Sequence, residues 1–336
     1  MRPRREAIDS IDAIDGKTGK LMIRFSHLIG LLACGGSSKP EVIRLDYANY
    51  NPLSLLLREK GYVEQALAPD GVRVEWVESL GSNKALELLN SKSADFASTA
   101  GAAALIARAN HSPIRAVYVY SKPEWTALVT RPGAGIERVA DLKGKKVAVT
   151  RGTDPFVFLL RALDSAGLTE ADIELVPLQH SDGKLALERG DVDAWAGLDP
   201  MMASAELQSQ ARLVFRNPDW NTFGVLDVRQ DFADSYPAYV VRVLEAYERV
   251  HDEAVADPNA LYGALERKAH LPEAVARRVL ARTDLASTSI GEPQARAIEA
   301  AGLVLKKSGV IPAESDVGAI TAELIDTTFQ AKLRRQ

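Results

Sequence analysis

The residues best suited to bind a ligand stand where a predicted strand gives way to a predicted helix. In the middle of the chain a buried strand, 146–150, leads into a short turn, and Thr153, Asp154 and Pro155 then open a helix. Asp154 suits the N-cap, and Pro155 suits the first helical position because its missing N–H costs nothing there. An exposed helix N-terminus offers free N–H groups and the positive end of the helix dipole, so this corner can face a ligand.

The same strand-to-helix corner recurs four times along the chain. The residues at these turns are mostly small or polar, and we expect them to line a ligand site: Tyr50 and Asn51 after the strand 42–47, Ser82 and Asn83 after 72–77, Thr99 and Ala100 after 94–97, and Asp199 after 192–197. Ordinary N-capping explains any one such corner. All five together favour a binding site, because open parallel sheets bind their ligands at the carboxyl ends of the strands.

Two acidic residues at these corners bear on the charge of the ligand. Asp154 and Asp199 are both predicted N-caps, so part of each carboxylate bonds to its own helix. If the remaining oxygens face the site, the ligand carries a cationic or N–H-bearing part as well as any acid group. Arg151 either forms a surface salt bridge, which we favour, or supplies the cation that an acidic ligand needs. His180 is interpreted as an exposed loop histidine.

Composition places the chain among ordinary soluble proteins. Of its 336 residues 46% are hydrophobic and 26% charged, and the net charge is −4 with scattered basic residues, which gives no indication of nucleic-acid binding. Five histidines and one cysteine are too few and too dispersed for a cysteine-based metal site or a disulfide framework. We therefore expect no metal and no cofactor.

The N-terminal segment, 1–40, is predicted to be a signal and tether rather than part of the fold. A short apolar run, 25–33, resembles a signal-peptide core, and Leu31-Leu32-Ala33-Cys34 resembles the lipobox of bacterial lipoproteins. Gly35-Gly36-Ser37-Ser38 then suits a flexible tether. A thiol at a small-residue cleavage site can accept an acyl chain, so Cys34 is the predicted lipidation site; the alternative is a lone buried cysteine. Met1 and Met22 both remain possible starts.

Strand and helix alternation predicts an α/β protein of two lobes with a cleft between them. Two turn-rich stretches, near 121–131 and 217–228, are expected to carry the chain between lobes. This gives lobe 1 as 41–125 plus 225–336 and lobe 2 as 126–224. Trp125 and Trp220 lie at the crossings, where an aromatic ring can wall the cleft or belong to the core, and Trp125 and Asn221 are the candidate ligand residues there. Trp76 and Trp195 lie inside predicted strands and are expected in the core.

A series of segments resembles the substrate-binding proteins of bacterial ABC importers for sulfonates, taurine and nitrate. The matching pieces follow one another in the family's order: 74–78, 85–90, 94–96, 139–148, 160–163 with 166–168, 188–195, and Asp199-Pro200. Two positions depart from the family pattern. Leu198 precedes Asp-Pro where an aromatic residue is common, and Asp154 opens a helix whose preceding loop is usually rich in glycine and serine.

The resemblance implies a type II periplasmic-binding-protein fold, two Rossmann-like lobes joined by two hinge strands. It also implies capture of a small organic solute, of sulfonate type, by closure of the cleft, with delivery to an ABC permease and its ATPase. We expect a monomer outside the cytoplasm, in the periplasm or on the outer face of the plasma membrane, held to the membrane only by the lipid on Cys34. No chemistry on the ligand is implied.

Two other functions compete with solute capture. A biosynthetic enzyme on the same fold, resembling thiamine-pyrimidine synthases, needs acid–base or metal groups in the cleft, and no His/Asp/Glu cluster stands at the corners. The effector domain of a transcription regulator needs a helix-turn-helix near its N-terminus, and residues 1–40 do not predict one. Solute binding is therefore the favoured function.

Lipidation of Cys34 can be tested directly. The wild-type protein should label with palmitate in a bacterial host, and the Cys34→Ala protein should leave the membrane fraction because it lacks the acyl acceptor. Labelling that survives the substitution contradicts the prediction.

Overall fold

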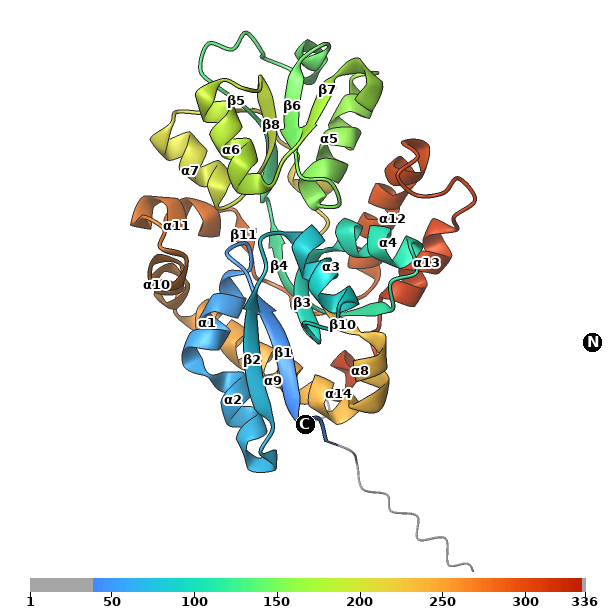
Figure 1. Cartoon of the computed structure of the whole chain (residues 1–336). Coiled ribbons are helices and arrows are strands. Elements are labelled where there is room, and N and C mark those ends of the chain that lie inside the picture. Colours follow the sequence, from blue (N-terminus) through green and yellow to red (C-terminus); the bar gives the residue numbers. More distant parts are fainter. Residues whose placement is uncertain (1–38, 334–336) are drawn as a thin grey trace, which may run out of the picture. The chain divides into compact units, whose positions relative to one another are not determined.

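The computed structural model describes residues 39–333, and its strands form two separate β-sheets (Figure 1). The predicted lipidation site and nearly all of the predicted signal segment lie outside the described residues. The first sheet has the order β11-β4-β10-β3-β1-β2 and the second the order β7-β6-β8-β5-β9. We call each sheet with the helices that pack on it a lobe, lobe 1 and lobe 2.

The first sheet is built from β1 (Val42–Tyr47), β2 (Arg73–Glu78), β3 (Phe96–Ala100), β4 (Ile114–Pro123), β10 (Gly224–Arg229) and β11 (Thr283–Asp284). The second is built from β5 (Thr126–Thr130), β6 (Lys146–Val149), β7 (Glu174–Pro177), β8 (Ala194–Leu198) and β9 (Arg212–Phe215). In each sheet three strands run parallel, β2-β1-β3 and β7-β6-β8, and antiparallel strands complete it. Parallel strands bring their carboxyl ends to one edge, so the corners that follow them gather there.

The helices before the second crossing are α1 (Pro52–Lys60), α2 (Tyr62–Leu67), α3 (Ser82–Asn90), α4 (Gly101–Ala109), α5 (Asp154–Ser165), α6 (His180–Arg189) and α7 (Met201–Gln208). After it come α8 (Gln230–Ser235), α9 (Pro237–Ala256), α10 (Pro258–Ala269), α11 (Glu273–Leu280), α12 (Glu292–Lys307), α13 (Val317–Leu324) and α14 (Gln330–Leu333). The chain is thus helical after β10 apart from the short β11, as the sequence predicts.

The chain passes between the sheets twice. It leaves the first sheet at the end of β4 and enters the second with β5, and it returns between β9 and β10. Two crossings are what the sequence predicts. The predicted lobe bounds of 41–125 plus 225–336 and 126–224 stay a proposal; every strand falls within them except that Gly224 begins β10 one residue earlier.

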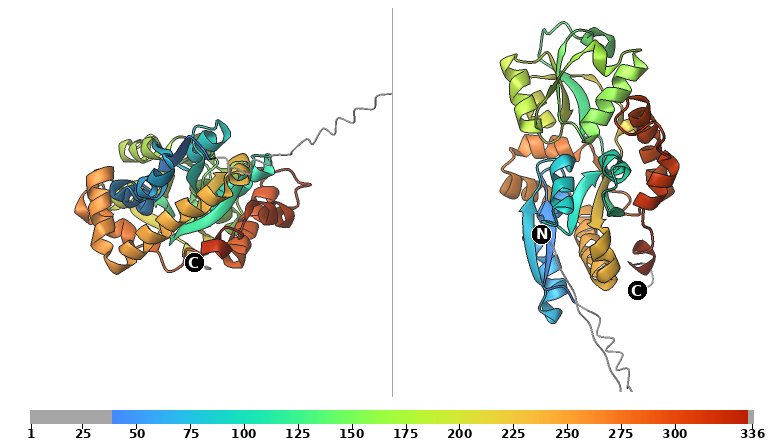
Figure 2. Two further views of the ribbon diagram at one scale, coloured as in Figure 1. Left: turned by 90° about the horizontal axis from the view of Figure 1, so that it is seen from below. Right: turned by 45° about the vertical axis from the view of Figure 1, so that its right-hand side comes forward.

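Alternation along β8 explains how the second sheet is covered on both faces. Ala194 and Ala196 face the cluster that contains the buried side of α5, whereas Trp195 packs with residues of α6 and α7. The right-hand view of Figure 2 shows helices on both faces of this sheet. Trp195 is fully buried, as expected. Trp76 is only half-buried, and its indole N–H donates to Glu64 at 2.7 Å.

The predicted boundaries differ from the structure at two corners. β3 continues to Ala100, so Thr99 and Ala100 are strand residues rather than turn residues, because β10 pairs with β3 along its full length. Helix α5 begins at Asp154 itself, and Thr153 takes the N-cap position. By contrast, Asn51 caps α1 as predicted, with its side chain accepting from the Ser54 N–H.

The close packing of β10 against β4 gives a stability prediction. A Cβ at Gly224 would lie 2.2 Å from the ring of Tyr120, which is buried and cannot move aside. Gly224→Ala should therefore lower the free energy of unfolding by about 1–3 kcal/mol in urea titrations. Gly318→Ala is the control, since Gly318 is exposed on α13 and the nearest neighbour of an added Cβ would be 3.5 Å away, and it should be neutral or slightly stabilising. Equal losses in both variants contradict the packing argument.

Candidate functional site

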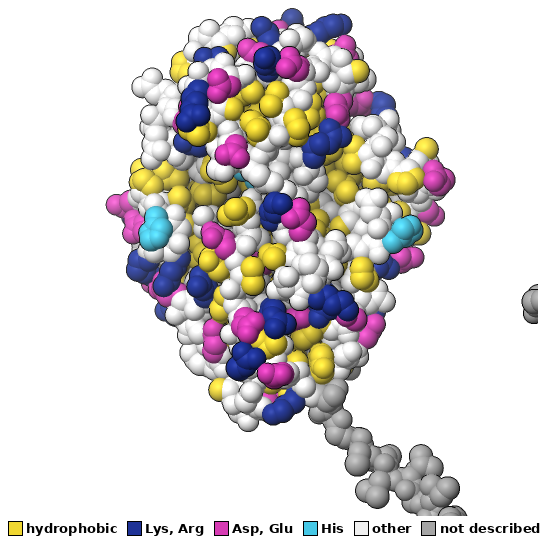
Figure 3. All heavy atoms as spheres, in the orientation of Figure 1, with side chains coloured by type: hydrophobic (Ala, Val, Ile, Leu, Met, Phe, Trp, Pro, Cys, Tyr) yellow, Lys and Arg dark blue, Asp and Glu magenta, His cyan; other side chains and the backbone are white. Residues whose placement is uncertain are grey.

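A cleft of about 300 Å³ is lined by both lobes. Lobe 1 contributes Asn49, Tyr50, Ser79 and Leu80, lobe 2 contributes Gln179, His180, Ser181, Lys184, Pro200, Met201 and Ser204, and Leu271 follows α10. Polar side chains line the cleft at the start of α6 and at Asn49, Tyr50 and Ser79 of lobe 1, and apolar side chains line it at Leu80 and near α7 and α11. Figure 3 shows hydrophobic side chains gathered where α7 meets α11.

Helix α6 begins in the lining of this cleft, helix α3 of the opposite lobe begins two residues after the lining residue Leu80, and neither helix has a side-chain cap. Gly81 precedes α3 and Gln179 precedes α6, and neither makes a side-chain hydrogen bond to its helix. The first N–H groups of an α-helix have no partner within the helix, so both ends offer free donors. Each end also carries the positive pole of a helix dipole, worth roughly 0.3–1 kcal/mol to a nearby anion. The arrangement suits a negatively charged group held between the lobes.

The lobes touch beside these helix starts. A Cβ at Gly81 would lie 2.9 Å from Asn83 Oδ1 and 3.0 Å from His180 Nε2, so only glycine lets lobe 1 approach lobe 2 this closely. The φ angle of Gly81 is +147°, a conformation that other residues rarely adopt. On the other side, Gly152 of lobe 2 faces the Cβ of Asn83. Because Gly81 and Gly152 have no side chains, the backbone can approach closely at both positions, and the start of α3 lies against lobe 2.

His180 is buried, with 1% of its surface exposed, and the expectation of an exposed loop histidine is wrong. Thr150 Oγ1 donates to the Leu178 carbonyl at 2.7 Å, so it accepts from His180 Nδ1 at 3.1 Å. Burial lowers the pKa of His180 to about 3, which keeps the ring neutral. Its Nε2 is then a hydrogen-bond acceptor.

Buried acceptors without a partner gather at this junction. Asn83 Oδ1, Gln179 Oε1 and His180 Nε2 are all buried, and none has a hydrogen-bond partner among residues 39–333. Gln179 and His180 line the cleft itself, and Asn83 lies against His180 across Gly81. Unpaired buried acceptors are costly, so a ligand that donates hydrogen bonds is favoured here.

Asp154 is a hinge residue rather than a ligand residue, which corrects the sequence prediction. It is 2% exposed. Its Oδ2 accepts from Trp125 Nε1 at 2.8 Å and from the Thr222 N–H at 3.1 Å, and its Oδ1 accepts from Thr222 Oγ1 at 2.6 Å. Burial raises its pKa, and the bonds from Thr222 and Trp125 oppose that rise. Trp125 and Thr222 belong to the two crossings, so one carboxylate joins both.

Asp199 is likewise buried against protein groups and not directed at a ligand. Helix α7 begins after Asp199-Pro200, and Asp199 Oδ1 accepts from the Ala203 N–H at 2.9 Å. Arg282 Nε lies 3.3 Å from its other oxygen. Burial raises the pKa of Asp199 to about 7 although Arg282 opposes the rise. The amine preference inferred from these two carboxylates therefore loses its basis.

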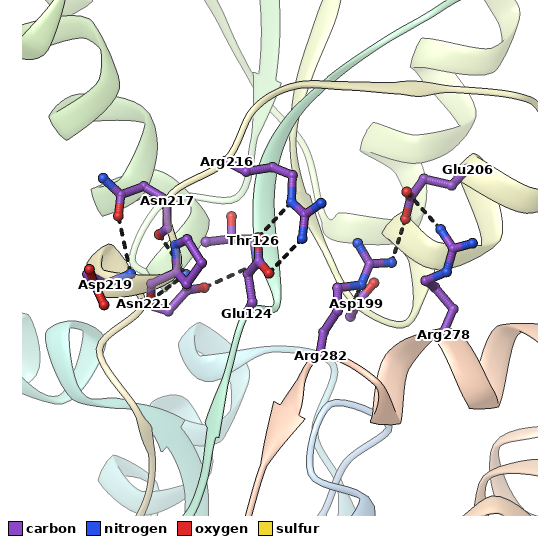
Figure 4. A network of polar contacts seen from close by, with 11 residues as sticks. Glu124, Thr126, Asp199, Glu206, Arg216, Asn217, Asp219, Asn221, Arg278 and Arg282 are labelled. Carbon is purple, nitrogen blue, oxygen red and sulfur yellow. Dashed lines mark hydrogen bonds and ion pairs between the residues drawn. The ribbon is translucent and has the colours of Figure 1, made fainter.

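The crossings carry further polar contacts (Figure 4). Asn221 Oδ1 accepts from the Thr126 N–H at 3.2 Å, and Arg216 pairs with Glu124 through two bonds of 2.7 Å. These contacts join the first crossing to the second. Asn221, predicted to contact ligand, is thus a structural residue of the hinge.

Figure 4 also shows how the C-terminal helices reach lobe 2. Arg278, at the end of α11, and Arg282 both pair with Glu206 of α7. Charges in this network are largely buried, which makes loss of one partner costly. The network ties α11 to the helix that forms the apolar end of the cleft.

The remaining predicted residues divide between lining and support. Tyr50 lines the cleft, whereas Ser82 Oγ accepts from the Ala100 N–H at 3.0 Å. Thr99 Oγ1 donates to Asp227 at 2.6 Å within the first sheet. Thr153 Oγ1 donates to the Thr150 carbonyl at 2.6 Å. Arg151 pairs with Glu170 on the surface, as favoured. Sequence reasoning missed Gln179 and His180, which no short-range signal separates from an ordinary loop.

One group of residues in the described chain comes within metal-binding distance. Glu248, His251 and Asp252 of α9 bring one ligand atom each within 4.8 Å of one another. Asp252 is exposed, and the group is not part of the cleft lining. We assign no metal to the cleft.

The chain is similar to known proteins over most of its length. The NMT1/THI5-like family matches it over residues 55–261, more than half of its length. The chain belongs to the NMT1/THI5-like family. It is 31% identical, over 65% of its length and 69% of the relative, to an Escherichia coli K12 protein described as an aliphatic sulfonates-binding protein.

Two solved structures share the fold. The alkanesulfonate-binding protein SsuA of Xanthomonas axonopodis pv. citri, bound to MOPS, matches with a TM-score of 0.78 and 24% identity, over 87% of this chain and 100% of that one. The periplasmic aliphatic sulphonate-binding protein SsuA of Escherichia coli matches with a TM-score of 0.73 and 26% identity, over 86% and 93%. The predicted type II periplasmic-binding-protein fold is thereby confirmed. No helix within residues 39–333 is long and apolar enough to cross a membrane.

The hinge contact of Asp154 predicts a stability loss. Asp154→Ala removes the acceptor of three hydrogen bonds and leaves Trp125 and Thr222 unpaired, so unfolding free energy should fall by about 1–3 kcal/mol. Asp164→Ala is the matched control, because it lies on the same helix in a half-exposed pair with Lys307 and should change stability by less than about 1 kcal/mol. Chemical denaturation of both variants decides it, and equal losses contradict the hinge role.

Proposed function

We propose that this protein is an extracytoplasmic solute-binding protein that captures a small organic sulfonate in the interlobe cleft and delivers it to an ABC importer. One observation carries the proposal: the uncapped N-terminus of α6 lines the cleft, and the uncapped α3 of the opposite lobe begins two residues after Leu80, which also lines it. The names of the relatives, aliphatic sulfonates-binding proteins, support the same ligand class. Closure on the anion would bring both helix ends to its oxygens.

The polar end of the cleft suits a sulfonate bound through neutral donors. A sulfonate presents three oxygens over which one negative charge is spread, and helix N–H groups can approach them from two sides. Lys184 is the one lysine or arginine of the lining, and its Nζ already lies 2.8 Å from Glu188. His180 stays neutral and supplies no charge. The helix dipoles and the free N–H groups therefore provide most of the attraction for the anion.

The apolar end suits the organic part of the ligand. Pro200 and Met201, at the start of α7, and Leu271, just before α11, line this end of the cavity. Covering apolar surface contributes about 25 cal/mol per Å². A ligand with a short carbon chain or ring next to its sulfonate gains from this end, and an inorganic anion such as nitrate does not.

The unpaired acceptors favour a sulfonate that also carries an amine or hydroxyl group. Gln179 and His180 line the cleft, and Gln179 Oε1 and His180 Nε2 have no partner among residues 39–333, so each would accept a hydrogen bond from a ligand that reaches it. This preference replaces the one expected from Asp154, whose oxygens are used within the hinge. An N–H donor there is worth about 0.5–1.5 kcal/mol.

An enzyme that uses the same cleft is the less supported alternative. The cleft lining contains no carboxylate, and its histidine is neutral and unpaired with any acid. General acid–base catalysis needs such groups within hydrogen-bond reach of the substrate. We therefore propose binding without chemistry, by a monomer whose partners are the permease and ATPase of an importer. The same proposal places the protein in the periplasm or on the outer face of the plasma membrane, with Cys34 as its lipid anchor.

Calorimetry with matched ligands tests the proposal. We expect an aminoalkanesulfonate to bind about two- to tenfold tighter than the alkanesulfonate of equal length, because it fills an empty acceptor. The corresponding alkanecarboxylate, with one oxygen fewer, should bind more weakly than either. Failure of every sulfonate to bind contradicts the proposed function.

Gly81→Ala serves as the site variant in the same experiment. Its Cβ would enter the contact with His180, so the affinity for sulfonate should fall at least about tenfold, or 1.4 kcal/mol. Gly318→Ala, in an exposed helix, should bind like the wild type. Unchanged affinity in Gly81→Ala would show that the lobes do not meet at α3 when the ligand is bound.

A further inference from the structure

A buried carboxylate lies beneath the polar end of the cleft. Asp46, in β1, is 0% exposed. Its Oδ1 accepts from the N–H and the Oγ–H of Ser98, both at 2.8 Å, and its Oδ2 lies 2.6 Å from Ser79 Oγ. Ser79 Oγ in turn lies 2.9 Å from the Tyr50 hydroxyl. Asp46 is therefore one hydrogen bond from Ser79 and two from Tyr50, and both of these residues line the cleft.

This series of hydrogen bonds has one hydrogen atom too few when Asp46 is ionised. There are three contacts to fill: Asp46 to Ser79, Ser79 to Tyr50, and Tyr50 to the Ser98 carbonyl at 2.9 Å. Two hydroxyl groups supply two hydrogens, and a carbonyl can only accept. The third hydrogen has one source, a proton on Asp46 Oδ2. Asp46 then donates to Ser79, Ser79 donates to Tyr50, and Tyr50 donates to Ser98.

We propose that Asp46 holds a proton when an anionic ligand occupies the cleft, and that it acts as a positioning residue for the hydroxyl groups of Ser79 and Tyr50. The inference rests on the proposed function, because it requires an anion in this cleft. A neutral Asp46 fixes the direction of both hydroxyl hydrogens. It also removes a buried negative charge from beneath the anion, where low dielectric makes repulsion strong.

Among residues 39–333, the groups that act on Asp46 include no compensating cation. Titratable groups near it are Tyr50, Tyr120 of β4, Tyr247 of α9 and Asp227 of β10, and none of these four carries a positive charge. Burial raises the pKa of Asp46 to about 6, while the bonds from Ser79 and Ser98 lower it. Burial also raises the pKa of Asp227 to about 7, and Thr99 opposes that rise. A second buried carboxylate thus disfavours charge on the first.

The direction of the pH dependence follows from linkage. An alkanesulfonate is ionised at every pH of interest, and its charge favours the protonated form of Asp46. Below pH 6 the free protein already holds this proton, so affinity is highest there. As the pH rises through the pKa of Asp46, binding must take up a proton, and affinity falls by up to about tenfold per pH unit. His180, neutral throughout, contributes nothing to this change.

Titration calorimetry with butanesulfonate tests the inference. Between about pH 5.5 and 8, the Kd of the wild type should rise roughly tenfold or more, and two buffers of different ionisation enthalpy should report proton uptake near neutral pH. Asp46→Asn keeps an oxygen for Ser98 and cannot titrate, so its Kd should stay within about twofold over the same range. Asp227→Asn is the control for the neighbouring carboxylate and should keep the wild-type slope.

Ser79→Ala keeps the test decisive even where Asp46→Asn does not fold. It removes the hydroxyl group that Asp46 contacts, so the pH at which affinity begins to fall should shift from its wild-type value, whatever the absolute affinity. A wild type that binds butanesulfonate with no pH dependence, or a slope that disappears in Asp227→Asn instead, overturns this inference and leaves the proposed function intact. If the protein binds no sulfonate at any pH, the proposed function itself is contradicted, and this inference is contradicted with it.

Discussion

One buried carboxylate holds the two crossings between the lobes together. Asp154 accepts hydrogen bonds from Trp125 in the first crossing and from Thr222 in the second. Thr222 Oγ1 also accepts from the Ala102 N–H at the start of α4 in lobe 1. The first turns of α5 and α4 are thus linked through two side chains. Any change in the angle between lobes must pivot about this point or break it, and the position of the cleft walls depends on it.

The cleft that this hinge positions recognises charge without presenting an unpaired cation. Its one lysine is paired, its histidine is neutral, and a carboxylate lies beneath it. What remains is the pair of helix ends at α3 and α6, whose N–H groups are fixed by the fold. Fixed dipoles need little reorganisation when the anion arrives, and they recognise geometry as well as charge. A proton on Asp46 completes this arrangement by removing the nearest negative charge.

Local rules predicted the features that neighbouring residues determine. The bounds of β1 and the cap of α1 by Asn51 follow from a β-branched run and an Asn-Pro pair. The role of Asp154 could not be predicted in this way, because its partners lie 29 and 68 residues away. His180 looked like a loop residue for the same reason: it is buried by Thr150 and by the other lobe. Long-range contacts decided the roles of Asp154 and His180, whereas the start of α5 differs from the prediction by a single residue of a local cap.

The most direct test of the account is a crystal structure of the complex with 2-bromoethanesulfonate. Anomalous scattering locates the bromine and the sulfur separately, so it fixes both ends of the ligand. We predict the sulfur between the first turns of α3 and α6, with the bromine toward Met201 and Leu271. A sulfur peak at the apolar end, or beside a surface arginine outside the cleft, would contradict capture by the paired helix ends.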